Sequence, residues 1–195
     1  MRGWIVSIAI VAAASCGRGR DTGQTPAPAP QAPPKAVAPP AAPAPGQPAP
    51  VAPVAAESLG ALLPDLAGWT KEPTRSEVVT SPVSYSRAEA HYIQGDSTIE
   101  LVLTDSGFQP LLVAPVEVFL SPGSDERSGG TVRTAVTLSG SPASETWTAS
   151  ARRGEVTVLV ARRFIVTATG RAVAGLDPVR AAVRGVNVSR LAGLR

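Results

Sequence analysis

The sequence has few of the side chains that build catalytic and metal sites. Among 195 residues it has one cysteine, one histidine and one methionine, and aromatic residues make up 4%. One cysteine excludes a disulfide within the chain, and zinc sites typically need more His or Cys ligands than this chain has. We therefore expect no metal site, no cofactor and no catalytic residue, which argues against an enzyme.

The apolar run near the N-terminus is too short to cross a membrane. Residues 4–15 carry no charge, but they number twelve, whereas a membrane-spanning helix needs about 20 apolar residues. A short positive segment, residues 1–3, precedes the run, and small residues end it. This pattern is typical of a signal peptide, which we assign to residues 1–15.

The only cysteine, Cys16, directly follows this segment. The small residues 13–15 before it and Gly17 after it resemble the lipobox of bacterial lipoproteins. In that family a peptidase cuts before the cysteine, whose thiol then takes a diacylglycerol. The resemblance implies lipidation of Cys16 and attachment to a membrane through the lipid, and it explains a lone thiol that would otherwise be a liability in an oxidising compartment.

The lipobox departs from the family at one position, because Ala13 stands where Leu is usual. The alternative is a cut after Ala14, at an A-x-A site, which would release a soluble protein with a free thiol. In the lipoprotein family an Asp directly after the cysteine favours retention in the inner membrane. Gly17 is not that signal, so the resemblance implies the outer membrane of the cell envelope, at its periplasmic face or the cell surface.

Proline and alanine dominate the next segment. They make up 23 of the 32 residues at positions 24–55. Proline restricts φ and biases its predecessor toward extended backbone, so such a segment cannot form a packed core. We expect residues 16–56 to form a disordered tether of polyproline II character, with a reach on the order of 100 Å.

The net charge of +3 belongs to the first 56 residues, because residues 57–195 hold 14 basic and 14 acidic side chains. A nucleic-acid partner is therefore not expected. Within the domain, residues 57–126 hold 11 acids and 3 bases, whereas residues 127–195 hold 11 bases and 3 acids. Ion pairs between the two halves would balance this asymmetry; a dipolar surface facing a charged membrane or partner is the alternative.

Residues 57–195 form one globular domain of α+β class. Alternating apolar residues predict a hairpin over residues 83–93 and 98–104, with Ile99, Leu101 and Leu103 on one face. Four further strands, at residues 131–138, 143–150, 155–160 and 163–169, predict an antiparallel meander. We expect helices at residues 57–63 and 109–120, and one that starts with Asp177 as N-cap and Pro178 at N1, followed by a last short turn at residues 189–194. A buried extended segment is the alternative for residues 109–120.

These elements predict an antiparallel sheet of about five to seven strands with helices packed on one face. Their order, with the strand at residues 163–170 and the closing helix, resembles the Mog1/PsbP-type sandwich over residues 60–190. The resemblance concerns the fold and implies no function.

Candidate functional residues in the domain are few. Glu89 and Glu100 lie on the two strands of the hairpin, and His91 shares a strand face with Glu89. Pairing of the carboxylates with arginines is the simpler interpretation than acid–base catalysis. A deep cavity that holds these three side chains together would favour an enzyme.

Two arginine doublets and two aromatic residues are candidates for a binding surface. Arg152-Arg153 and Arg162-Arg163 flank a predicted hairpin and would form a basic edge for an anionic lipid or glycan, unless they are only solvated hairpin charges. Tyr85 and Trp147 would form a binding surface if they were exposed together near a groove.

Two functions agree with these features. The first is a non-enzymatic binding or accessory domain, tethered to the membrane at the cell envelope, with an envelope protein or a glycan as partner. The alternative is an envelope enzyme or a ligand-sensing domain with a minimal carboxylate site. The oligomeric state and the specific ligand do not follow from the sequence.

Overall fold

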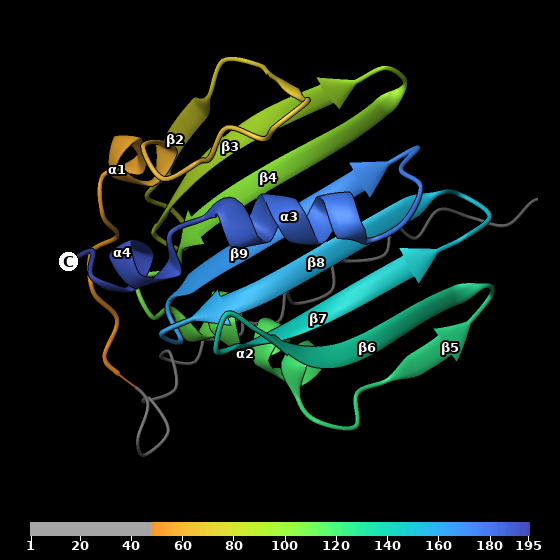
Figure 1. Ribbon diagram of the computed structural model, residues 1–195. Helices are drawn as coiled ribbons and strands as arrows, with labels where there is room; N and C mark the ends of the chain where they lie inside the picture. The colour runs from red at the N-terminus through yellow and green to blue at the C-terminus, as the bar shows by residue number, and fades with distance from the viewer. Residues whose placement is uncertain (1–47) are drawn as a thin grey trace, which may run out of the picture. The chain divides into compact units, whose positions relative to one another are not determined.

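A computed structural model describes residues 48–195 of the chain. The predicted signal peptide, Cys16 and the tether up to residue 47 lie outside these described residues. Within them, four helices and nine strands form a domain of α+β class (Figure 1). In chain order the elements are α1 (Ala56–Gly60), β1 (Thr70–Lys71), β2 (Arg75–Val79), β3 (Tyr85–Gln94), β4 (Ser97–Asp105), α2 (Pro110–Leu120), β5 (Glu126–Ser128), β6 (Thr131–Leu138), β7 (Ser141–Thr148), β8 (Arg153–Val160), β9 (Phe164–Arg171), α3 (Asp177–Gly185) and α4 (Val188–Ala192).

All strand pairs in the described domain are antiparallel, and the strand order is β1-β3-β4-β9-β8-β7-β6-β5, with β2 also paired to β3. The β3–β4 hairpin and the β5–β9 meander join where β9 pairs with β4. Helix α2 carries the chain from β4 toward the far edge at β5. Its 11 residues make a rod about 16 Å long, which passes over about three strands spaced 4.8 Å apart.

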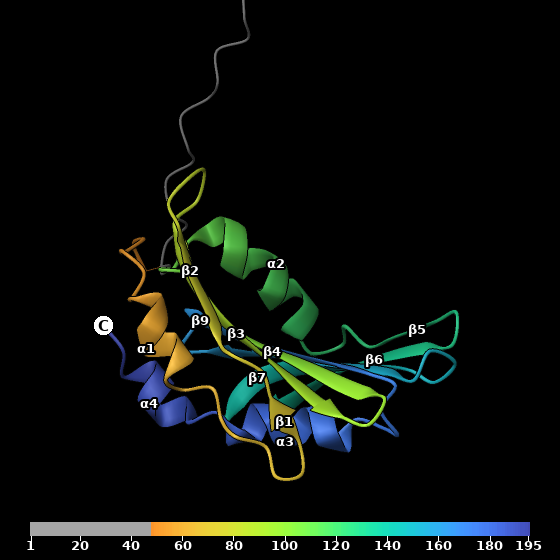
Figure 2. The same ribbon diagram turned by 90° about the horizontal axis from the view of Figure 1, so that it is seen from above.

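The first face of the sheet, on the side of Ile99, Leu101 and Leu103, carries the main core. These three side chains are buried as predicted, and they pack with Tyr92 and Phe164 in one cluster. The Tyr92 hydroxyl donates a hydrogen bond of 2.6 Å to the Pro64 carbonyl. Burial, helped by the charge of Asp65, raises the pKa of Tyr92 to about 12. Helices α1, α3 and α4 cover this face (Figure 2).

Helix α3 packs closely on the first face because two glycines lie beneath it. Gly154 and Gly170 are cross-strand partners in β8 and β9. A Cβ at Gly170 would lie 2.6 Å from Cγ2 of Val179, and one at Gly154 would lie 2.9 Å from Cδ2 of Leu176. The apolar side of this helix is buried against the sheet at Val179, Ala182 and Val183, and Val186, directly after the helix, is buried as well.

The second face of the sheet carries α2, so the prediction of helices on one face is wrong. Val113, Leu120 and Leu159 form a separate small apolar cluster there, with Val116 and Ile165 at its margin. Figure 2 shows α2 on the side of the sheet opposite α1, α3 and α4. The helix predicted over residues 109–120 is confirmed as α2, and one of its apolar sides faces this cluster.

The number of strands also exceeds the predicted five to seven. The additional strands β1, β2 and β5 are short, with two, five and three residues, and lie at the two edges of the sheet. Their side chains are mostly exposed, so they lack the alternation of apolar and polar residues that reveals a half-buried strand.

Two predicted boundaries differ from the structure, namely the end of the tether and the start of α3. Residues 51–56, predicted as tether, pack on the domain: Val54 is buried, and its N–H donates to the Asp105 carboxylate at 2.8 Å. Helix α3 has Leu176 as N-cap, and Asp177 lies inside the helix, where it accepts a hydrogen bond from Arg180. None of the helices within residues 48–195 is both long enough and apolar enough to cross a membrane.

Replacement of Gly170 by alanine tests the contact between α3 and the sheet. The added methyl group would overlap Val179, so we expect Gly170→Ala to lower the free energy of unfolding by about 1–3 kcal/mol in a denaturant titration. Gly175→Ala is the matched control, because a Cβ there meets no atom within 4 Å. Equal stability of the two variants would contradict the close packing of α3.

Candidate functional site

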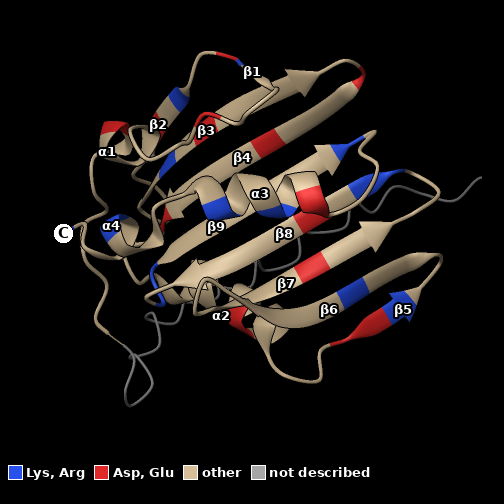
Figure 3. Ribbon diagram, in the orientation of Figure 1, with Lys and Arg blue, Asp and Glu red and all other residues tan. Residues whose placement is uncertain are grey.

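A row of polar side chains crosses the second face from one edge region to the other. Cross-strand partners lie on the same face of a sheet, and the register aligns the members of this row on seven strands, β3, β4, β9, β8, β7, β6 and β5. We call this set the polar row; its members are His91, Glu100, Thr169, Glu155, Thr146, Arg133 and Glu126. Charged residues are likewise spread over most of the strands rather than gathered at one edge (Figure 3).

A cavity of about 320 Å³ lies beside α2 on this face. Its volume falls within the range of about 300–1,000 Å³ that is usual for ligand sites. Apolar side chains of α2 and Ile165 form one wall, and hydroxyl groups, Arg133 and Glu155 form the rest. We call it the α2 cavity; its lining is Val116, Phe119, Leu120, Arg133, Ser144, Thr146, Glu155, Thr157, Ile165 and Thr167.

A second cavity, of about 410 Å³, shares Ile165 and Thr167 with the first. It is lined further by Arg87, Leu112 and Tyr85, and we call it the Tyr85 cavity. The shared residues make the two cavities neighbours along the second face.

Each of these cavities has an arginine with an unused donor in its wall. The Nε–H groups of Arg133 and Arg87 are buried and have no hydrogen-bond acceptor among the described residues. A buried donor without an acceptor costs about 1–3 kcal/mol. A ligand that offers an acceptor oxygen at either position would therefore be favoured.

The charges of the polar row are largely neutralised by neighbouring arginines. Glu155 lies 3.7 Å from Arg153, Glu126 is paired with Arg133, and Glu100 lies 3.6 Å from Arg87. The face therefore offers hydroxyl groups and paired charges instead of a free cationic or anionic patch.

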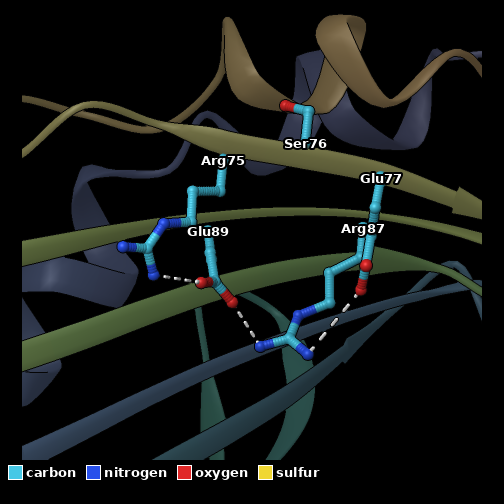
Figure 4. A pocket seen from close by; sticks show the side chains of 5 residues that line it. All are labelled: Arg75, Ser76, Glu77, Arg87 and Glu89. Atoms are coloured by element: carbon cyan, nitrogen blue, oxygen red, sulfur yellow. Dashed lines mark hydrogen bonds and ion pairs between the residues drawn. The ribbon is translucent and has the colours of Figure 1, made fainter.

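The predicted Glu89, Glu100 and His91 do lie close together, as part of an ion-pair network. Arg87 Nη2 lies 2.5 Å from Glu89 Oε2 and 3.6 Å from Glu100 Oε1, while His91 Nε2 lies 3.6 Å from Glu89 Oε1. Figure 4 shows Arg75 on the other oxygen of Glu89. The predicted pairing of both carboxylates with arginine is thus observed.

A third cavity, of about 290 Å³, adjoins this network, and its lining includes Glu89 but neither Glu100 nor His91 (Figure 4). The residues around it are Arg75, Ser76, Glu77, Arg87 and Glu89, of which Ser76 points its side chain away from the other four. No group of three or more His, Cys, Asp or Glu side chains within residues 48–195 is placed to hold a metal ion.

The two arginine doublets do not come together as one basic edge. Arg152 and Arg153 stand at the start of β8, and Arg162 and Arg163 follow its end, so an eight-residue strand of about 26 Å separates them. Arg152 donates to the carbonyls of Ala172 and Val173, Arg153 pairs with Glu155, and Arg162 pairs with Glu117 at 2.8 Å.

Arg163 is buried and has a structural partner. Its guanidinium makes two hydrogen bonds of 2.7 Å to the two carboxylate oxygens of Asp105. It also lies over the rings of Phe108 and Phe164, at 5.5 and 4.9 Å from their centroids. Arg163 is therefore not available as part of an exposed binding surface.

Tyr85 and Trp147 lie on opposite faces of the sheet. Tyr85 lines its cavity on the second face, whereas Trp147 packs partly buried against the main core, beside Gly154. Phe119, which the sequence did not single out, is the aromatic residue that shares the second face with Tyr85.

Three ion pairs join the acidic and the basic halves of the domain, between Asp105 and Arg163, Glu117 and Arg162, and Glu126 and Arg133. Internal pairing therefore balances part of the charge asymmetry.

Comparison with known proteins adds no relative, because no protein-family model, no curated protein and no solved structure matches this chain. The lipobox and the Mog1/PsbP-type resemblance remain predictions.

Loss of the Asp105 charge tests the buried pair. Asp105→Asn would leave the buried Arg163 without a counter-charge, so we expect the free energy of unfolding to fall by about 3–5 kcal/mol. Glu117→Gln, at the more exposed pair with Arg162, should cost less than about 1 kcal/mol. Equal losses, measured by denaturant titration, would show that the buried Asp105–Arg163 pair matters no more for stability than the exposed Glu117–Arg162 pair.

Proposed function

We propose that this protein is a membrane-tethered binding module of the cell envelope, with its ligand surface on the second face of the sheet. The observation that carries the proposal is the pair of neighbouring cavities beside α2, each with an arginine Nε–H that lacks an acceptor. Cys16 supplies the anchor and residues 17–47 the spacer in this proposal. A lipid anchor and a long spacer would let such a face reach ligands away from the membrane surface.

The ligand that fits this face best is an uncharged chain rich in hydroxyl groups, that is, a glycan. Hydroxyl groups of Ser144, Thr146, Thr157 and Thr167 line the α2 cavity and can both donate and accept hydrogen bonds. Phe119 and Tyr85 supply one aromatic ring to each cavity. An anionic ligand fits less well, because Arg133 and Arg87 already have carboxylate partners.

An enzyme with a carboxylate site is the second candidate, and the closeness of Glu89, Glu100 and His91 is the observation in its favour. Both carboxylates have Arg87 as an ion-pair partner, so neither is free to act on a ligand. The pairing therefore supports the binding module over the enzyme.

The anchor is tested by Cys16→Ala in the producing cell. We expect the variant to lose labelling by radioactive palmitate and to move from the membrane fraction to the soluble fraction, because two or three acyl chains are needed for lasting attachment. Ser15→Ala, beside the cysteine, is the matched control and should behave as the original protein does. Unchanged labelling and fractionation of Cys16→Ala would show that the protein is not a lipoprotein.

The ligand face is tested with residues 16–195 carrying Cys16→Ala, titrated with hexasaccharides of N-acetylglucosamine, glucose and mannose. We expect NMR shift changes at β7–β9 for at least one of them. The double variant Thr146→Val and Thr167→Val keeps the side-chain volume and removes two hydroxyl groups, so binding should weaken by about tenfold.

Thr134→Val is the matched control for this titration, because Thr134 lies in β6 on the first face, opposite Glu145. Absence of shift changes with all three glycans, or changes confined to the first face, would contradict a glycan surface beside α2.

A further inference from the structure

Helix α2 has a second apolar side, which is exposed. Leu111, Val118 and Phe119 are 75%, 66% and 48% exposed, and Ala114 and Pro115 between them are exposed as well. Residues three or four positions apart lie along one side of a helix. We call this set the α2 stripe; its members are Leu111, Ala114, Pro115, Val118 and Phe119.

The opposite side of the same helix is buried at Val113 and Leu120. The one charged residue of α2, Glu117, is paired with Arg162 at 2.8 Å. The helix is therefore apolar on both sides and carries no free charge. A helix that is apolar all round is usually covered on all sides, and exposed apolar patches mark contacts with a membrane or a partner.

The chain reaches the domain at the same place. The Val51 N–H donates to the Gly107 carbonyl at 2.8 Å, shortly before α2 begins at Pro110. Pro48 lines a small cavity together with Phe108, Pro110, Val113 and Arg162. The Pro/Ala segment that connects the domain to Cys16 therefore ends beside the N-terminal end of α2.

We propose that the α2 stripe docks on the surface of the lipid bilayer to which the chain is anchored; the anchor itself rests on the proposed function. A tether holds the bilayer within reach of the domain at high local concentration, so a weak contact is sufficient for docking. None of the five members is basic, and the guanidinium of Arg133, which lies 4.8 Å from the centroid of the Phe119 ring, is paired with Glu126. The stripe therefore binds by inserting apolar side chains instead of by attracting anionic headgroups.

A stable contact with a second copy fits the stripe less well. Protein–protein interfaces of standard size bury about 800 Å² per partner and use roughly 20–30 residues on each side. The stripe offers five side chains on one helix. So small a surface predicts reversible docking. The domain would bind the bilayer and then dissociate from it, to a distance that the tether limits.

Vesicle flotation tests the docking directly. Residues 16–195 with Cys16→Ala, which has no acyl chain, are mixed with vesicles of phosphatidylcholine and with vesicles of equal parts phosphatidylcholine and phosphatidylglycerol. We expect similar binding to both, unchanged by added salt. The double variant Leu111→Asn and Val118→Asn should lower the partition coefficient by about tenfold or more, and it should stay folded because both side chains are exposed.

The matched control is Val78→Asn with Ile93→Asn, which replaces two apolar side chains that are exposed in β2 and β3. It should bind vesicles as the parent does. No binding to either vesicle, binding only to the anionic vesicles with loss in salt, or a dimer in sedimentation that the α2 variant abolishes would each overturn the proposal. Vesicle binding is measured without Cys16, so it tests the docking of α2 alone, whereas palmitate labelling tests the lipid anchor. Either proposal can therefore be refuted without the other.

Discussion

The carboxylate of Asp105 holds together the parts of the domain on which the candidate surface depends. It is fully buried, and it accepts hydrogen bonds from the Val54 and Gly107 N–H groups and from the guanidinium of Arg163. It thereby joins the arriving chain, the end of β4, the start of the link to α2 and the β8–β9 turn. The Ser106 hydroxyl adds a bond of 2.7 Å to the Arg163 carbonyl. A buried ion pair is costly to break once formed, so the position of α2 over the sheet is tightly determined.

That position divides the second face into covered and open parts. Where α2 lies, Leu159 and Ile165 are apolar and pack beneath it. Beyond the helix the strands present the polar row, because no other element within residues 48–195 covers them. The candidate surface is therefore the part of the sheet that α2 is too short to reach, and the same helix supplies the apolar wall of the main cavity.

Much of the fold follows from periodicity, and the rest depends on contacts distant in sequence. Alternation at Ile99, Leu101 and Leu103 correctly predicted the core strand β4, but β1, β2 and β5 show no such pattern because both of their faces are exposed. Asp105 lies two positions after Leu103 and therefore points to the same buried face of the sheet. This position is the one signal in the sequence for its burial. Its partner Arg163 is 58 positions away, so the sequence does not pair the two residues, and the doublet Arg162-Arg163 has the pattern of exposed charge. The polar row was likewise hidden, since its members come from strands whose register only the folded sheet reveals.

The attachment of the chain beside β4 also has a mechanical consequence. A pull on the N-terminal segment enters the domain through the bonds from Val51 to Gly107 and from Val54 to Asp105. Asp105 is the last residue of β4, a strand with neighbours on both sides. Tension therefore reaches the interior of the sheet and is shared by the β3–β4 and β4–β9 ladders. An edge strand pulled in the same way would lose its hydrogen bonds one at a time, so attachment beside β4 resists tension on the N-terminal segment better than attachment at an edge strand would.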